Sequence, residues 1–204
     1  MKRQALAVAI YALAMALLEA VVVVYLRRLL GVQGPGYSPG VSLGALHGLE
    51  AAREAATLVM LGAVGYLAGR NTTQRLGAFA LAFGVWDIGY YLGLAALIGW
   101  PRSPLDWDLL FLLPSPWWGP VLAPVLVSLV LVWGGLRWMY GGQANWASAA
   151  IWAVGAGLLL LGFLLAHPYN FPWLVFGLGL VLFAYGWLGV GRFKPGGYRS
   201  PSKP

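Results

Sequence analysis

The sequence predicts an all-α, polytopic membrane protein with six transmembrane helices. Of its 204 residues, 60% are hydrophobic and only 9% are charged, and the mean hydropathy is +0.75. This composition is typical of chains embedded in a bilayer. Apolar runs of about 20 residues recur along the chain, and each is long enough to cross the hydrocarbon core. We therefore expect one transmembrane domain over residues 1–191 and a basic cytoplasmic tail, rich in Pro, Gly and Ser, over residues 192–204.

The first three spans are predicted over residues 5–26, 44–69 and 76–98. The first apolar run continues past the small residues that a signal peptidase would need and ends at Arg27 and Arg28. We therefore interpret it as an uncleaved helix. Residues 31–42, which are rich in Gly and Pro, are predicted to form a loop.

One long connection, residues 99–119, separates the third span from the fourth. Prolines interrupt it, and Asp106, Trp107 and Asp108 have the composition of a short helix that lies at the membrane interface. We expect this segment to act as a lid. The remaining spans are predicted over residues 120–139, 146–166 and 171–190. Pro124 should kink the fourth span, and the glycines of the last two should let those helices approach closely.

Basic residues near the span ends predict the orientation. Nine of them fall on the side of the N-terminus and three on the other side, and cytoplasmic loops carry the excess of Lys and Arg. We therefore predict that both termini are cytoplasmic, in a prokaryotic cytoplasmic membrane. The nine are Lys2, Arg3, Arg70, Arg75, Arg137, Arg192, Lys194, Arg199 and Lys203, and the three are Arg27, Arg28 and Arg102.

The composition also excludes several classes of function. Cysteine is absent, which excludes disulfides, thiolate metal sites and cysteine nucleophiles. The orientation accounts for the net charge of +7, so we expect the lipid bilayer, and no nucleic acid, as the partner of this basic chain. No lysine lies inside a predicted span, and no phosphate-binding glycine loop occurs.

Titratable residues gather in the outer half of the second span. At roughly 100° per residue, His47, Glu50 and Glu54 share one helical face, and Arg53 lies beside them. An ionised group in hydrocarbon costs about 2.5 to 3.5 kcal/mol, so this face should meet protein, water or a ligand. Glu19 and Asp87 lie within the neighbouring spans. We predict that these carboxylates share one pocket, which opens toward the extracytoplasmic side and is covered by residues 100–118.

Four carboxylates and one arginine cannot all be ionised at low dielectric without compensation. Protons must be taken up, Arg27 or Arg28 must fold inward, or a cation must bind. We predict Glu50, Glu54 and Asp87 as catalytic residues, that is, ligands or proton acceptors. The predicted ligand-binding residues are Glu19, Arg53, Trp86, Tyr90, Tyr91 and Asp108.

A metal site is a second prediction for the same stretch. His47, Glu50, Glu54 and His167 have the donor types of carboxylate-rich iron, manganese or zinc sites in helical bundles. Two histidines are also enough for a single haem. The plainer alternatives are a buried ion-pair network around Arg53, an interfacial His47 and a loop histidine at position 167.

The leading functional hypothesis is a pocket that binds a metal ion or an amphiphilic ligand such as a quinone, an isoprenoid or a lipid. The sequence leaves open whether that ligand is transformed or only held. One alternative is a non-catalytic subunit of a larger membrane complex, for example a respiratory or photosynthetic one, or a homo-oligomer. Another is a small proton-coupled carrier that uses Asp87 as a relay.

Overall fold

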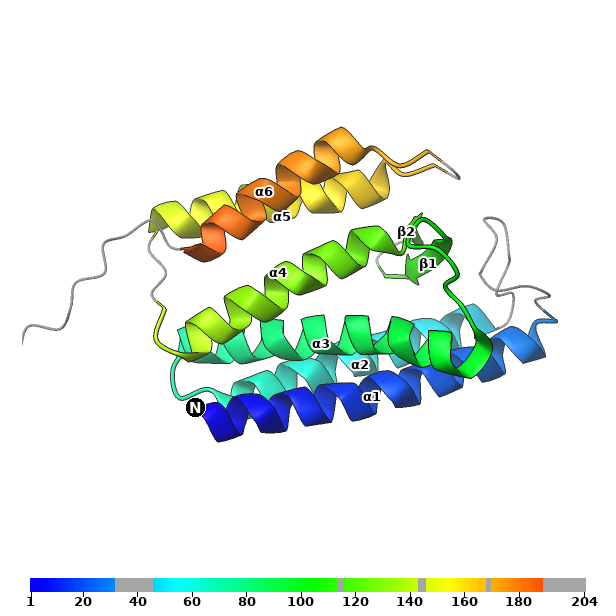
Figure 1. Cartoon of the computed structure of the whole chain (residues 1–204), viewed down its shortest axis with the longest axis horizontal. Helices are drawn as coiled ribbons and strands as arrows, with labels where there is room; N and C mark the ends of the chain where they lie inside the picture. The colour runs from blue at the N-terminus through cyan, green and yellow to red at the C-terminus, as the bar shows by residue number, and fades with distance from the viewer. Residues whose placement is uncertain (32–45, 114–115, 143–145, 168–169, 189–204) are drawn as a thin grey trace, which may run out of the picture.

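The computed structural model describes residues 1–31, 46–113, 116–142, 146–167 and 170–188. Six helices and one two-stranded hairpin make up this part of the chain (Figure 1). Residues 32–42 of the loop predicted at 31–42 and the predicted tail at 192–204 lie outside the described residues. The elements are α1 (Lys2–Leu29), α2 (His47–Ala68), α3 (Thr72–Ile98), β1 (Trp107–Phe111), β2 (Trp117–Pro120), α4 (Leu122–Met139), α5 (Trp146–Leu164) and α6 (Trp173–Leu188).

The helical character of the chain is confirmed, and its long apolar helices are compatible with insertion into a membrane. Five helices, α1 to α5, are long and apolar enough to cross a membrane. The described part of α6 is equally apolar but has only 16 residues, fewer than a full crossing requires. Six crossings and the orientation of the chain in the membrane therefore remain predictions.

The helices form two groups joined by α4 (Figure 1). The first three helices lie together, α4 packs along α3, and the α5–α6 pair lies on the far side of α4. Glycine makes the contact between α3 and α4 possible, because a Cβ on Gly77 would lie 2.8 Å from the carbonyl oxygen of Gly135.

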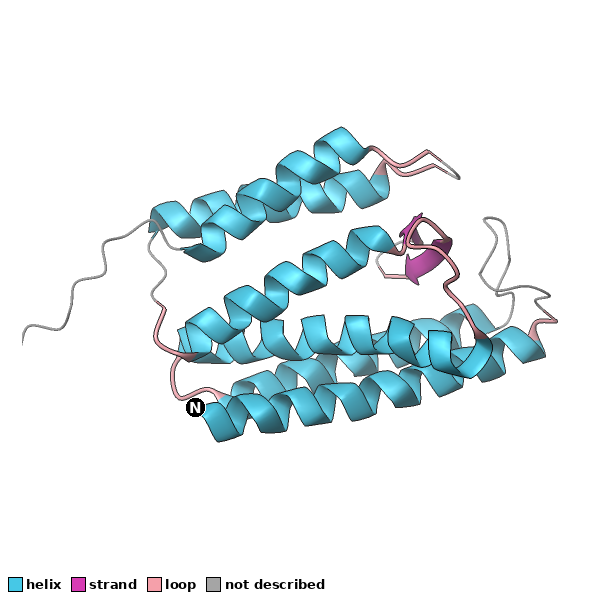
Figure 2. Cartoon of the chain, in the orientation of Figure 1, coloured by secondary structure: helices cyan, strands magenta, loops and turns pink. Residues whose placement is uncertain are grey.

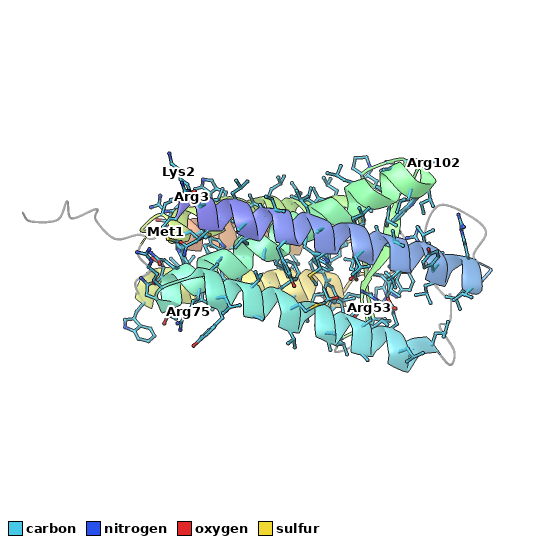
Figure 3. The ribbon with its side chains drawn as sticks, turned by 90° about the horizontal axis from the view of Figure 1, so that it is seen from below. Met1, Lys2, Arg3, Arg53, Arg75 and Arg102 are labelled. Atoms are coloured by element: carbon cyan, nitrogen blue, oxygen red, sulfur yellow. The ribbon has the colours of Figure 1, made fainter. Side chains whose placement is uncertain are left out.

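The basic residues separate toward the two ends of the bundle. Figure 3 shows Lys2, Arg3 and Arg75 near one end and Arg102 at the other. The buried interior between these ends contains few ionisable groups, so those that it does contain are prominent.

All six helices differ by a few residues from the predicted spans at one or both ends. The last turn of α1 includes Arg27, which is buried, so this residue does not mark the membrane flank. Helix α3 begins at Thr72 because the side chain of Asn71 accepts a hydrogen bond from the backbone N–H of Gln74 at 3.0 Å and caps the helix. Pro124 falls in the first turn of α4, where a missing N–H breaks no helical hydrogen bond, so no kink is needed.

The connection between α3 and α4 differs most from its prediction. It forms an antiparallel hairpin instead of an interfacial helix (Figure 2), in which Trp107 pairs with Pro120 and Asp108 with Gly119. The strand pairing satisfies backbone groups that would otherwise lie unpaired in an apolar environment. Asp106 stabilises the preceding turn, because its Oδ2 accepts hydrogen bonds from the N–H groups of Arg102 and Ser103 at 2.7 and 3.1 Å.

Candidate functional site

A cavity of about 160 Å³ lies among α1 to α5 and the hairpin. Five predicted site residues from three helices line it. We name them the carboxylate cluster: Glu19, Glu50, Arg53, Glu54 and Asp87. The structure thus brings these five residues together around one cavity. The hairpin residues 109–112 also line the cavity, so the connection contributes directly to its wall.

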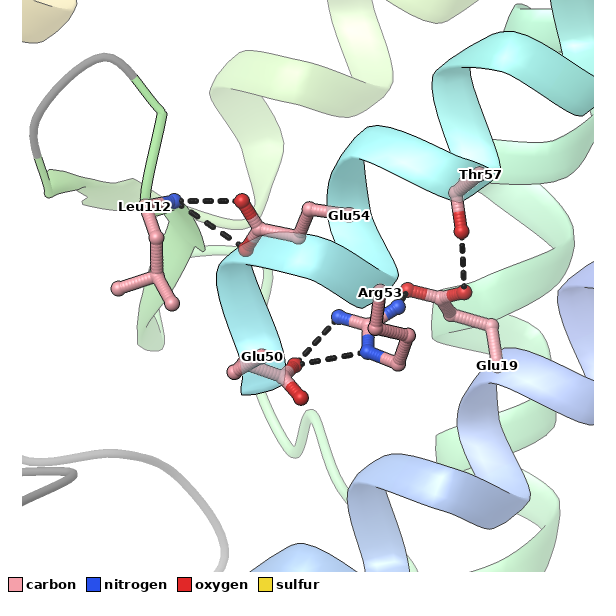
Figure 4. Close-up of polar contacts among 6 residues, drawn as sticks. All are labelled: Glu19, Glu50, Arg53, Glu54, Thr57 and Leu112. Atoms are coloured by element: carbon pink, nitrogen blue, oxygen red, sulfur yellow. Dashed lines mark hydrogen bonds and ion pairs between the residues drawn. The ribbon is translucent and has the colours of Figure 1, made fainter. Parts of the chain in front are cut away.

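Arg53 is the centre of the cluster. Its guanidinium forms ion pairs with Glu19 on α1 and with Glu50 one turn earlier on α2 (Figure 4). The Nε atom also donates to Glu50 Oε1 at 2.9 Å. Figure 3 shows this arginine between the ribbons of α1 and α2. One guanidinium thus serves two carboxylates and joins two helices.

Glu19 has a second partner on α2. The hydroxyl of Thr57 donates to Glu19 Oε2 at 3.2 Å, while Arg53 binds the other oxygen (Figure 4). Only 8% of Glu19 is exposed, so its charge depends on these two contacts. The role of Glu19 is therefore to hold Arg53 and α2 in place.

Glu54 binds the hairpin through the main chain. The backbone N–H of Leu112, directly after β1, lies 3.1 and 2.9 Å from the two carboxylate oxygens (Figure 4). Hydrogen bonds from N–H groups stabilise a carboxylate in an apolar site. This contact fixes the hairpin against α2 and encloses the cluster.

Asp87 reaches the cavity from the middle of α3. It is buried, and the hydroxyl of Ser128 on α4 donates to its Oδ2 at 2.8 Å. A hydroxyl satisfies one oxygen of this carboxyl group but brings no positive charge. Asp87 therefore lies in the cavity without a cation directly bonded to it among the described residues.

The cluster holds more acid than base. Its four carboxyl groups and one guanidinium give a formal charge of −3 when all are ionised, since −4 and +1 sum to −3. Such a surplus at low dielectric requires protons or a bound group that donates hydrogen bonds or positive charge. The cavity therefore favours a ligand that donates to carboxylate oxygens.

The cavity also has an aromatic wall, which consists of Phe83, Trp86, Phe111, Trp117 and Phe163. The rings of Phe83 and Trp86 lie 5.3 Å apart, and those of Trp117 and Phe163 are stacked at 5.9 Å. Such spacing is typical of favourable aromatic pairs, and the wall suits a flat, apolar body.

Tyr90 and Tyr91, both predicted as ligand-binding residues, also line the cavity. Their rings lie 5.0 Å apart, and the ring of Tyr91 lies 6.2 Å from that of Trp100. With Trp86 in the aromatic wall, the three aromatic residues predicted for ligand binding all reach the cavity.

Asp108 has a different role from the one predicted. It does not line the cavity; it is 1% exposed and pairs with Arg27 at 3.4 Å. The Arg27 guanidinium also lies 4.3 Å from the centre of the Trp100 ring. Burial raises the pKa of Asp108 to about 7, although Arg27 acts to lower it. An inward fold of Arg27 or Arg28 was one expected way of compensating the charge of the carboxylates. Arg27 does fold inward, but it pairs with Asp108 of the hairpin and not with the carboxylate cluster.

The predicted metal site does not form. No three of His47, Glu50, Glu54 and His167 come close enough to hold a metal ion, and neither does any other such group among the described residues. Both histidines are exposed and outside the cavity lining, with His167 paired to Asn170 in the turn between α5 and α6. A cavity the size of a single ring is also too small for a haem macrocycle.

The sequence analysis missed several contributors to the site. Thr57 and Ser128 bind Glu19 and Asp87, but each is a lone hydroxyl in an apolar span, a weak signal in a sequence. The Leu112 N–H leaves no signal at all, because every residue except proline carries this group. Comparison of the chain with protein-family models, curated proteins and solved structures finds no match.

Proposed function

We propose that the cavity binds the polar head group of an amphiphilic, quinone-type ligand whose tail remains in the bilayer. The observation that carries this proposal is that the carboxylate cluster and the aromatic wall face the same cavity. Ligand sites in proteins typically combine such an apolar surface with a few convergent polar groups. The chain thus offers a surface for the face of a ring and acceptors for the groups at its edge.

The volume of the cavity determines which part of a ligand can enter it. An engineered cavity of about 150 Å³ holds one benzene molecule, and this cavity measures about 160 Å³. A single ring fits, whereas an isoprenoid chain or a phospholipid does not. The tail of an amphiphile would therefore stay among the exposed apolar side chains at the membrane-facing surface.

The residues divide into two roles in this proposal. Glu50, Glu54 and Asp87 accept hydrogen bonds or protons from the head group. Glu19 and Arg53 position α1 and α2 around it through their ion pair. We place the cavity toward the extracytoplasmic side, which the distribution of Lys and Arg supports.

Equilibrium binding tests the proposal. We expect saturable quenching of tryptophan fluorescence when decyl-1,4-benzoquinone or its hydroquinone is added to the protein in lipid nanodiscs, because Trp86 and Trp117 line the cavity. Glu50→Ala and Glu54→Ala should weaken binding of the hydroquinone, which donates hydrogen bonds to carboxylates, about tenfold each, the loss expected for a buried hydrogen bond to a charged group.

Asp106→Asn is the matched control, because Asp106 is acidic but lies in the turn before the hairpin and outside the cavity lining. Its affinity should equal that of the wild type. Quenching that never saturates, or that is the same in all four proteins, would refute the proposal. The hypotheses of a complex subunit and of a proton-coupled carrier remain predictions from the sequence.

A further inference from the structure

Two buried hydrogen-bond donors at the cavity have no partner. The indole Nε1 atoms of Trp86 and Trp117 are buried, and neither finds an acceptor among the described residues. Both residues line the cavity, and Trp86 is only 5% exposed. A buried N–H group without a partner is destabilising, and native proteins usually satisfy it. These two donors are therefore available to a bound group that supplies an acceptor.

The carboxyl groups of Glu50 and Asp87 can accept more hydrogen bonds than the described residues donate to them. A carboxylate offers about four lone-pair positions. Arg53 binds Glu50 through Oε1, and Ser128 binds Asp87 through Oδ2. Both carboxyl groups can accept further hydrogen bonds, so a bound group should also supply donors.

These two requirements select the chemistry of the head group. A hydroxyl both donates and accepts a hydrogen bond, whereas a ketone only accepts and an ammonium only donates. A hydrocarbon ring does neither. The aromatic wall, which includes the stacked rings of Trp117 and Phe163, favours a flat, apolar ring as the body of the ligand. The polar groups of the ligand then lie at the edge of that ring. An aromatic ring with hydroxyl groups meets all of these conditions.

We infer that the cavity selects the reduced, hydroxyl-bearing form of its ring, a quinol or related phenol, over the oxidised quinone. This inference rests on the proposed function and narrows it to one ligand class. The ring hydroxyls donate to Glu50 and Asp87 and accept from the indole N–H groups of Trp86 and Trp117. The ring itself packs on the aromatic wall.

Four ligands with the same decyl tail separate the contributions. They are the 1,4-hydroquinone, kept reduced without oxygen, the 1,4-benzoquinone, the 1,4-dimethoxybenzene and the plain benzene. We expect the hydroquinone to bind about tenfold more tightly than the quinone and the dimethyl ether, and decylbenzene to bind most weakly. Quinone binding equal to or tighter than hydroquinone binding overturns the inference and leaves the proposed function standing. If none of the four binds, both fail.

Trp86→Phe tests the donor side, because it keeps an aromatic ring and removes only the N–H group. The affinity for the hydroquinone should fall several-fold, while that for decylbenzene, which has no acceptor, should not change. Trp133→Phe, on the exposed surface of α4, is the matched control and should bind all four ligands as the wild type does. If Trp86→Phe does not fold, Trp117→Phe removes the second donor. Unchanged hydroquinone binding in the folded variant overturns the inference.

Discussion

At the scale of single residues, Arg53 decides whether the carboxylate cluster is stable. Its guanidinium pairs with carboxylates on two helices, Glu19 on α1 and Glu50 on α2. Removing one partner from a buried ion pair is far more costly than the net contribution of the pair, because the remaining charges stay uncompensated. The arginine is therefore more important for folding than a count of its contacts suggests.

Arg53→Met should lower the free energy of unfolding by about 3 kcal/mol, the low end of the range for buried pairs, since the arginine side chain is 21% exposed. Thermal unfolding of the purified protein measures this loss. Arg28→Gln is the control, because Arg28 is exposed near the end of α1 and substitution there should change stability by less than about 0.5 kcal/mol. Equal midpoints for the two variants would contradict the role given to Arg53.

The pair of Asp108 and Arg27 predicts a dependence of stability on pH. Burial raises the pKa of Asp108 from 3.8 to about 7. Between these values the folded chain keeps a proton that the unfolded chain has released, so the contribution of this group to stability falls as the pH rises through that window. Asn does not titrate, so Asp108→Asn should remove this contribution.

Unfolding midpoints measured between about pH 4 and about pH 8 test this prediction. The midpoint of the wild type should fall more steeply with rising pH than that of Asp108→Asn. Asp106→Asn, in the turn before the hairpin, serves as the matched control and should follow the wild type. A slope that is unchanged in Asp108→Asn would show that this carboxyl group is not the source.

At the scale of elements, the packing of α2 on α3 positions the site, because α2 carries Glu50 and Glu54 and α3 carries Asp87. The two helices approach closely at Gly65, where a Cβ would lie 2.8 Å from the backbone of Phe79. Backbone cannot move aside as the end of a side chain can. The distance between the two helices therefore depends on this glycine.

Gly65→Ala should destabilise the protein by about 1 to 3 kcal/mol, the cost of overpacking, and should weaken ligand binding by separating α2 from α3. Gly62→Ala is the matched control on the same helix, because a Cβ there meets nothing within 4 Å. Thermal unfolding and the quenching assay check both effects. If the two variants behave alike, close approach at Gly65 is not what sets the helix spacing.

The helices and the hairpin differ in how far the sequence predicts them. Apolar runs predict the spans because the bilayer requires them, whatever the rest of the chain does. The hairpin was predicted wrongly as an interfacial helix, since Trp107 to Phe111 is apolar and short enough for either structure. Its strand pairing and its contact with Glu54 are long-range, and local composition carries no record of them.

The same distinction applies to the site. Helical spacing and the cost of burying charge were enough to predict that Glu19, Glu50 and Asp87 meet. The partner of Arg27 was not predictable, because Asp108 lies 81 residues away in the chain. Among the described residues no three metal-donor side chains come together, and donor types alone could not predict whether two exposed histidines and two glutamates would meet.

At the scale of the whole molecule, the unequal distribution of Lys and Arg between the two ends of the bundle predicts its orientation in the membrane. The chain has no cysteine, so a single introduced cysteine is a unique label site. In intact cells, a membrane-impermeant maleimide should label Arg102→Cys, near the hairpin, and should label Arg70→Cys, between α2 and α3, only after permeabilisation. The reverse pattern would place the cavity toward the cytoplasm and contradict the predicted orientation.

The bond between Glu54 and the hairpin belongs to the peptide group of Leu112, so it does not depend on which side chain occupies that position. Natural selection can therefore keep this contact while residue 112 drifts among apolar types that fill its buried place. Position 54 has no such freedom, since only a carboxyl group accepts this N–H through both oxygens. In homologous chains, an invariant acid at 54 opposite a variable residue at 112 would be the evolutionary trace of a main-chain contact.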